Sequence, residues 1–199
     1  PVFVDSLGAL QQAAERGLPF DVGPHVPLTN RLSLEQAADF GATRVWLSPE
    51  LTLAQIKELA HDAPVELGLF VIGAQELMVT EHCLLMSQGP CDERCDACAR
   101  RKSPHYLRDR KDFEFPVVTD ALGRSHLYNS VALDVASALP ELLAAGVSSF
   151  LVDTTLMNGE EAAQAVGRAK RALAVAQNDG NAVGKMPGTT TGHLFRGVQ

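Results

Sequence analysis

The four cysteines of this 199-residue chain all lie between Cys83 and Cys98, in a single short segment. Their spacing is C-x7-C-x3-C-x2-C, so four thiols can converge on one point. As thiolates they would form a soft four-sulfur site, suited to zinc or to an iron–sulfur cluster. The intervening Gly89 and Pro90, with two nearby aspartates, predict a tight loop rather than a buried helix. The candidate ligands are therefore Cys83, Cys91, Cys95 and Cys98.

The alternative role for these cysteines is structural, as buried thiols or as disulfides. Clustered CxxC-type spacing in a chain that shows no secretion signal favours a metal over disulfides. The sequence contains neither a signal peptide nor a transmembrane run, so we expect a cytoplasmic protein with no membrane partner. The choice between an iron–sulfur cluster (4Fe–4S) and zinc stays open at this point.

A hydrolase needs a nucleophile with a base, or a metal with an open coordination position. Neither G-x-S-x-G nor HExxH occurs in the chain. Cys83 could form a thiol–base pair with His126. His82 is the poorer partner, because neighbouring side chains on a strand point apart. A ligand role for Cys83 is the simpler interpretation, since it belongs to the cysteine cluster.

Three further polar residues lie at or just after the ends of expected strands: His25, Glu50 and Glu76. In a barrel of parallel strands the carboxyl ends carry the active site, which makes these residues and His126 weak catalytic candidates. The ordinary alternative is a solvated polar side chain in a loop. The catalytic residues therefore stay unknown from sequence.

The composition limits the function classes. Hydrophobic residues make up 46% of the chain, enough for a sizeable core, and the formal net charge is -7. An acidic balance argues against broad, non-specific nucleic-acid binding. A local basic run beside the cysteines is the exception, with a solvated loop as its alternative explanation. The run consists of Arg94, Arg100, Arg101, Lys102, Arg108, Arg110 and Lys111.

The first part of the chain alternates strands with short helices. Strands are expected at 2–4, 20–26, 43–47 and 65–72, and the helices between them begin near Ser6, Ser33 and Thr52. Gln12-Ala-Ala-Glu-Arg-Gly17 returns as Gln36-Ala-Ala-Asp-Phe-Gly41, which marks repeated (βα) units. Such units predict an α/β fold with parallel strands, as a partial TIM-barrel-like sheet. An open doubly wound sheet is the alternative.

The pattern changes after the cysteines. A β-hairpin is expected at 113–119 and 124–129, with Gly123 in its turn. A helix containing Pro140, a strand at 147–152, a helix at 160–177 that Asn158 caps, and an irregular tail complete the prediction. We expect one domain over 1–199, a fragment of a longer protein. Its segments would be (βα) units at 1–80, a cysteine-rich loop at 81–112, the hairpin, helix and strand at 113–156, and the terminal helix and tail at 157–199.

An ordered set of short motifs resembles the peptidase U32 family, the collagenase-like proteases. The resemblance covers nearly the whole chain and is that of the C-terminal part of such a protein. The motifs are Leu47-Ser-Pro-Glu-Leu51, Phe70-Val-Ile-Gly-Ala74, His82-Cys83-Leu-Leu, Cys91-x3-Cys95, Leu107-Arg-Asp109, Phe115-Pro116-Val117, Asp120, His126-Leu-Tyr-Asn-Ser130 and Thr190-Thr-Gly-His-Leu-Phe-Arg-Gly197.

The resemblance implies a (βα) barrel-like fold and a peptidase or collagenase activity. It also implies, for some members, a role in RNA or quinone hydroxylation with a 4Fe–4S cluster on four cysteines. Cys83, Cys91 and Cys95 occupy the family's cysteine region, and Cys98 matches less closely because the fourth ligand can lie elsewhere. Gln75 and Glu76 stand where many members carry a cysteine.

Three functions from different classes follow. The first is a U32-type peptidase, and the second is an iron–sulfur protein acting on RNA or a quinone. The third is a binding scaffold with structural zinc. The choice between a peptide and an RNA substrate stays open. Half a barrel leaves an unpaired edge strand, so we also expect a homo-oligomer or a completing chain.

Overall fold

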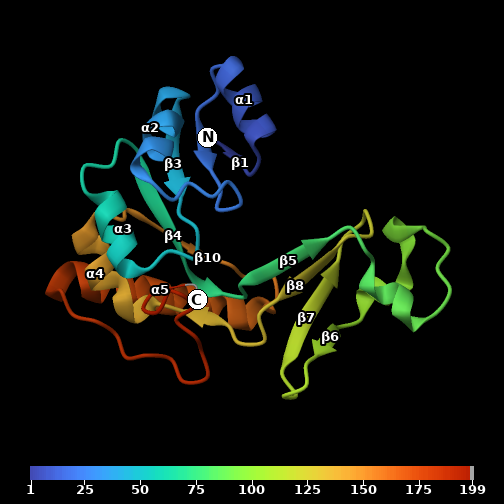
Figure 1. Ribbon diagram of the computed structural model, residues 1–199. Coiled ribbons are helices and arrows are strands. Elements are labelled where there is room, and N and C mark those ends of the chain that lie inside the picture. The colour runs from blue at the N-terminus through green and yellow to red at the C-terminus, as the bar shows by residue number, and fades with distance from the viewer. Residues whose placement is uncertain (198–199) are drawn as a thin grey trace. The chain divides into compact units, whose positions relative to one another are not determined.

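The computed structural model describes residues 1–197 and divides the chain into two compact units. Unit 1 combines Pro1–Gly73 with the residues from Leu133 onward, and unit 2 is Ala74–Ala132 (Figure 1). Unit 2 is thus an insertion between two parts of unit 1. The segment boundaries expected at 80 and 112 fall inside unit 2. The sheet of this unit contains one strand that precedes the cysteines and three that follow them.

The sheet of unit 1 is parallel along its main path. Its strand order is β1-β2-β3-β4-β10, and every neighbouring pair in that order is parallel. A short β9 adds to β4 in the antiparallel sense. The bounds are β1 (Val2–Val4), β2 (Phe20–Val22), β3 (Ala42–Trp46), β4 (Glu66–Gly73), β9 (Leu133–Asp134) and β10 (Ser149–Val152).

The predicted α/β fold is confirmed, whereas a closed barrel is not found. β1 and β10 end the strand order of the described sheet, and each pairs on its main path with one neighbour, β2 and β4 respectively. The sheet is therefore open along β1 and along β10. Parallel strands in this order place the carboxyl ends of β1, β2 and β3 on one edge, where polar side chains that follow these strands gather.

Helices connect the strands, and most of the α-helices begin where a side chain caps them. Ser6 accepts a hydrogen bond from the backbone of α1, and Thr52 forms a capping box with Gln55. The box expected at Ser33 lies one turn earlier, because Asn30 is the N-cap and Ser33 is its third-position partner. The bounds are α1 (Leu7–Glu15), α2 (Arg31–Asp39), α3 (Leu53–Ala60), the 3₁₀ turn η4 (Ala136–Ala138), α4 (Leu139–Ala145) and α5 (Gly159–Asp179).

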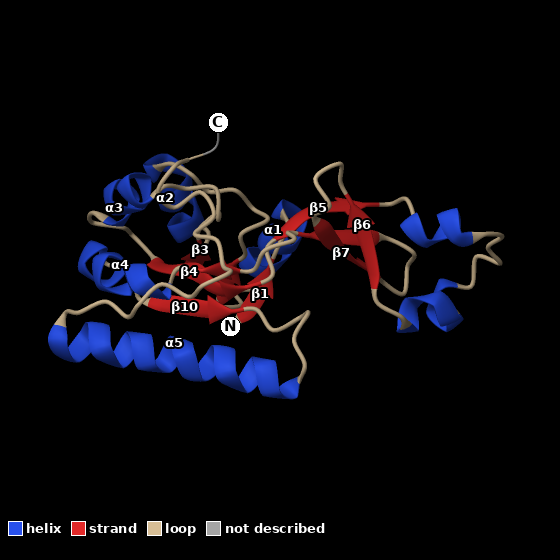
Figure 2. Cartoon of the chain, turned by 90° about the horizontal axis from the view of Figure 1, so that it is seen from below, coloured by secondary structure: helices blue, strands red, loops and turns tan. Residues whose placement is uncertain are grey.

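The later helices also follow sequence signals. Pro140 lies in the first turn of α4 and begins that helix rather than kinking it, since the missing N–H is not needed there. Gly146 ends α4 in the left-handed conformation. Asn158 caps α5 as predicted, and α5 is the long helix that packs against α4 and β10 (Figure 2).

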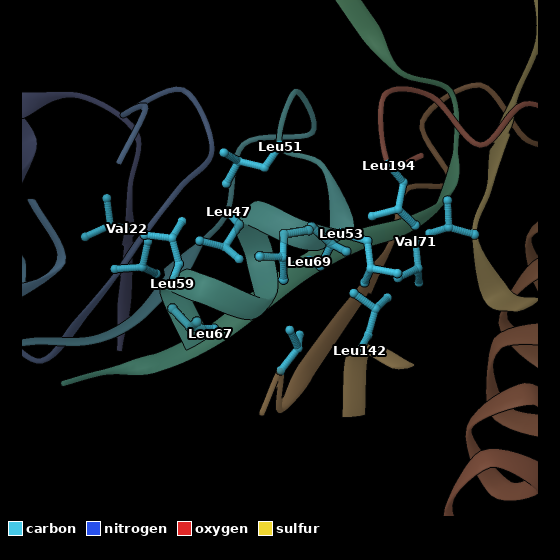
Figure 3. Packing of buried hydrophobic residues seen from close by; sticks show 14 of the residues in the cluster. Val22, Leu47, Leu51, Leu53, Leu59, Leu67, Leu69, Val71, Leu142 and Leu194 are labelled. Atoms are coloured by element: carbon cyan, nitrogen blue, oxygen red, sulfur yellow. The ribbon is translucent and has the colours of Figure 1, made fainter. Parts of the chain in front are cut away.

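The core of unit 1 lies between the sheet and its helices. Leu67 and Leu69 of β4 lie on the same face of the sheet. On that face Leu59 of α3 packs against the sheet (Figure 3). Leu194 of the tail is also buried, and its carbonyl accepts the N–H of Leu53 at 2.7 Å. The tail is irregular, as predicted, but it closes one end of the core. No helix within residues 1–197 is both long and apolar enough to cross a membrane.

Unit 2 contains a four-stranded antiparallel sheet in the order β5-β8-β7-β6. The predicted hairpin is confirmed as β7 and β8, while β5 and β6 were not predicted. Both lack strict alternation of apolar and polar residues. β5 pairs with β8, which is distant in sequence, and β6 pairs with β7 across a charged turn. The bounds are β5 (Glu76–Thr80), β6 (His105–Arg108), β7 (Glu114–Thr119) and β8 (Ser125–Tyr128).

Candidate metal centre

The cysteine segment connects β5 to β6 through three 3₁₀ turns. These are η1 (Leu84–Gln88), η2 (Cys95–Ala97) and η3 (Ala99–Lys102). The segment contacts the end of the antiparallel sheet at the β7–β8 turn, where the Leu84 N–H donates to Ser125 Oγ at 2.9 Å and Leu85 is buried. The prediction of a tight loop is therefore confirmed, and contacts with β8 hold the loop at the sheet.

All four cysteines line a single hollow. Its volume is about 260 Å³ including its open mouth, and no disulfide joins the thiols. Cys91 is exposed, whereas the other three are partly buried. The remaining lining residues are Asp92, Arg94, Arg101 and Thr119.

The thiols surround this hollow rather than meeting at one point. Within residues 1–197, no group of three or more His, Cys, Asp and Glu side chains is placed so that it could hold a metal ion as it stands. Four of the side chains that line the hollow are nevertheless thiols, which match the preference of iron–sulfur clusters and zinc. The cysteines predicted as ligands are thus together, and their binding of metal stays a prediction.

The electrostatics of the hollow reflect this crowding of thiols. Burial raises the pKa of the Cys95 thiol, and the nearby Cys91, Cys83 and Cys98 raise it further, while Arg101 opposes them. Each additional thiolate would therefore repel the others at short range. A bound cation would relieve that repulsion, so metal binding would release protons from the thiols.

A glycine in the β7–β8 turn closes one wall of the hollow. Gly123 has a φ of 87°, and a Cβ added there would lie 2.8 Å from Cys95 Sγ. The turn itself was predicted from its glycine, but its contact with a cysteine 28 positions earlier was not. Only a residue without a side chain allows this approach.

Replacing Gly123 by alanine should therefore displace Cys95 and weaken metal binding. A left-handed alanine costs about 1–2 kcal/mol in unfolding free energy, and the clash with sulfur adds to that cost. Metal content per chain and thermal unfolding measure the two effects. Gly8→Ala is the matched control, because Gly8 lies in α1 with open space around its Cβ and should be neutral or slightly stabilising. Equal metal content in both variants would show that the Gly123 contact is unimportant.

The side chain of His126 points away from the residues that contact the cysteine segment. Ser125 and Thr119 are paired across β8 and β7, Ser125 accepts from Leu84 of that segment, and Thr119 lines the hollow. His126 follows Ser125 directly, so its side chain points to the other face. The suggested Cys83–His126 thiol–base pair is therefore not formed in this structure.

The partners of His126 are carboxylates instead. Its Nδ1 lies 2.5 Å from Glu76 Oε1, and its Nε2 lies 3.6 Å from Asp120 Oδ2. Burial opposes ionisation of Asp120, but hydrogen bonds from the Arg124 side chain and from the backbone of Leu122 and Arg124 outweigh it and lower its pKa to about 2. Glu76 and Asp120 hold the imidazole of His126. Asp120 also stabilises the turn that contains Gly123, through hydrogen bonds from the N–H groups of Leu122 and Arg124.

A second polar pair lies at the carboxyl edge of the sheet in unit 1. The Nδ1 of His25 lies 2.5 Å from Asp5 Oδ2, and the His25 backbone N–H donates to Asp5 Oδ1 at 3.2 Å. Gly23 makes room for this contact, since a Cβ there would overlap the Asp5 carboxylate. Glu50 also follows its strand as expected but is exposed. Asp5 was not predicted as a partner, although a carboxylate directly after a strand was a visible signal.

The basic run beside the cysteines is largely engaged in contacts within unit 2. Arg94 pairs with Asp92 at 2.9 Å, and Arg108 pairs with Glu114 at 2.5 Å. Arg100 and Arg101 turn inward and donate to backbone carbonyls. Arg100 and Arg101 are thus less available to an external polyanion than the sequence suggested, whereas the rest of the run is exposed.

Comparison with known proteins agrees with the motifs in this chain. The family model described as Peptidase family U32 matches residues 2–188. The Uncharacterized protease MJ0090 of Methanocaldococcus jannaschii is 30% identical over 152 residues, which is 71% of this chain. Those residues span 36% of that relative, so the chain corresponds to about a third of its length. No solved structure matches the chain. The match over nearly every described residue shows that the chain belongs to peptidase family U32.

Proposed function

We propose that this chain is the metal-carrying part of a U32-type peptidase and that Cys83, Cys91, Cys95 and Cys98 bind a 4Fe–4S cluster. The observation that carries the proposal is the hollow lined by all four thiols. Four soft sulfur donors around one hollow are the ligand set that iron–sulfur clusters take. When bound, such a cluster supplies one-electron chemistry at a potential that the surrounding hydrogen bonds tune. Zinc is the alternative occupant of the same thiols.

The peptidase activity would require residues beyond those described here. His126 is held by carboxylates on the face away from the thiols, so it does not serve Cys83 as a base. The Asp5–His25 pair is an oriented imidazole of the kind that general bases use. We therefore expect the isolated chain to be a poor peptidase, with the remainder of the longer polypeptide completing the site.

The second candidate function is that of an iron–sulfur protein in a hydroxylation system acting on RNA or a quinone. The same observation favours it, because a four-thiol hollow has no evident task in peptide hydrolysis. Structural zinc in a binding scaffold is the third candidate. These functions differ in metal and in substrate, so one preparation can distinguish them.

The open edges of the sheet suggest a pairing partner, and the free thiols suggest a reducing compartment. β1 exposes Val2 and Phe3, and β10 exposes Leu151, at strands that lack a second neighbour on the main path. We propose that further (βα) units of a completing chain, or a second copy, pair with these strands and make the sheet more barrel-like. A reducing cytoplasm suits four free thiols.

The test combines metal analysis with hydrolysis. Protein purified without oxygen should contain iron and acid-labile sulfide in a near 1:1 ratio and show broad visible absorption. Hydrolysis of gelatin or of a fluorogenic peptide should be weak for the chain alone and should rise when the full-length polypeptide is used. Colourless protein with one zinc per chain would replace the cluster by the zinc alternative. A full-length protein that holds the cluster but cleaves no peptide would favour the hydroxylation system.

A further inference from the structure

Two consecutive arginines, Arg100 and Arg101, lie on η3 directly after the last cysteine. Both side chains are partly buried, which is unusual for arginine unless it is paired. Among the ion pairs of residues 1–197, neither guanidinium has a carboxylate partner. Both donate instead to backbone carbonyls of the segments that carry the other cysteines.

Arg100 holds the segment between the first two cysteines. Its Nη1 donates to the carbonyls of Leu85 and Gly89 at 3.2 Å each, and its Nη2 donates to the carbonyl of Pro90 at 2.9 Å. The Arg100 carbonyl in turn lies 2.6 Å from Nε2 of His105 on β6. Arg100 therefore joins the stretch leading to Cys91 to the sheet.

Arg101 holds the third cysteine against the hairpin. Its Nε donates to the carbonyl of Thr119 at 2.8 Å, and its Nη1 donates to the carbonyl of Cys95 at 2.7 Å. The same guanidinium lines the hollow beside the thiols. The planar guanidinium of Arg101 thus joins the backbone of Cys95 to the end of β7. It also places a positive charge beside the thiols.

The local chemistry explains why arginine occupies both positions. An irregular segment has carbonyls without a strand or helix partner, and these need donors when they are partly buried. A planar guanidinium presents five N–H donors in fixed directions, so it can bridge carbonyls from two segments at once. A lysine ammonium is a single point charge that cannot span them in the same geometry.

We propose that Arg100 and Arg101 are the positioning residues that assemble the four-cysteine site before metal enters it. This inference rests on the proposed metal site and adds to it the residues that hold the thiols around the hollow. Arg100 sets the arm that ends at Cys91, and Arg101 sets Cys95 against the hairpin. Cys98 is carried by the turn that precedes both arginines.

Metal affinity of single variants tests the proposal. Arg100→Gln and Arg101→Gln should each lower the affinity for iron or zinc by about 10–100-fold, as loss of outer-shell support does elsewhere. Reconstitution without oxygen, followed by competition with a chelator, gives the affinities. Arg101→Lys should recover only part of the loss. Arg108→Gln is the control, because Arg108 is paired with Glu114 and Asp112, which lie outside the cysteine segment. Wild-type affinity in both glutamine variants, or full recovery with lysine, would overturn the proposal.

A second measurement needs no variant and no metal. Phenylglyoxal modifies accessible guanidinium groups, and peptide mapping assigns the modified residues. In the metal-free wild-type chain, Arg100 and Arg101 should react at least about tenfold more slowly than the exposed Arg110, since their N–H groups are engaged. Equal rates of modification at Arg100, Arg101 and Arg110 would contradict the proposed arginine contacts, even if the variants failed to fold. A wild-type chain that takes up no metal would overturn the proposed site, whereas slow modification would still support the arginine contacts.

Discussion

Serine in place of Cys95 should strip the bound metal from the protein and loosen the segment between β5 and β6. Cys95 is held on two sides, because its carbonyl accepts from Arg101 and its sulfur lies against the Gly123 turn. A hydroxyl is a hard and weakly acidic donor, and it does not replace a thiolate toward iron or zinc. Since structural metal binding is worth about 10–16 kcal/mol in small zinc domains, loss of one ligand should lower affinity by several orders of magnitude.

The measurement is metal and sulfide content after identical reconstitution of each variant. Cys91→Ser should behave like Cys95→Ser, and Cys98→Ser shows whether the fourth thiol is a ligand. Ser103→Ala is a suitable control, because Ser103 is exposed and closes the same segment without lining the hollow. Full metal content in both the Cys91 and Cys95 variants would remove the basis for a metal site. Limited proteolysis should show faster cleavage between β5 and β6 in the variants that lose metal.

The parts of the fold that were predicted correctly depend on short-range signals. Ser6, Thr52 and Asn158 cap helices through contacts within three residues, so the sequence carries the complete motif. The parallel strands of unit 1 follow from apolar runs between those helices. The box at Ser33 was misplaced because Asn30 is an equally good cap one turn earlier. Convergence of the cysteines was predicted for the same reason: all four lie in one short segment.

The parts that were not predicted depend on contacts between distant residues. β5 pairs with β8, 45 or more positions away, and its exposed Leu77, Met78 and Val79 show no alternation that would mark it as a strand. The support of Cys95 by Gly123 has no local signal, since a turn glycine looks the same with or without a sulfur beside it. Arg100 and Arg101 resembled part of a solvated basic run, and only the folded segment reveals their carbonyl partners.

Removal of Arg168 should cause the largest loss of stability in unit 1. Asp134 is only 3% exposed, and its carboxylate receives two hydrogen bonds from the Arg168 guanidinium on α5, at 2.5 and 3.1 Å. Arg168 also donates to the carbonyl of Gly184 in the tail at 2.9 Å. With glutamine at 168 the carboxylate would stay buried without its counter-charge, which costs about 3–5 kcal/mol in unfolding free energy.

Urea unfolding followed by the fluorescence of Trp46, which lies in unit 1, measures this cost. Arg171→Gln is the matched control on α5, because Arg171 is exposed and should change stability by less than about 0.5 kcal/mol. The double variant Asp134→Asn with Arg168→Gln should be more stable than Arg168→Gln alone, since it leaves no unpaired buried charge. An Arg168→Gln variant as stable as the Arg171 control would mean that the ion pair contributes nothing. A double variant less stable than the single one would mean that the Asp134 charge stabilises the fold even without Arg168, because asparagine can still accept the hydrogen bond from the Ala136 N–H.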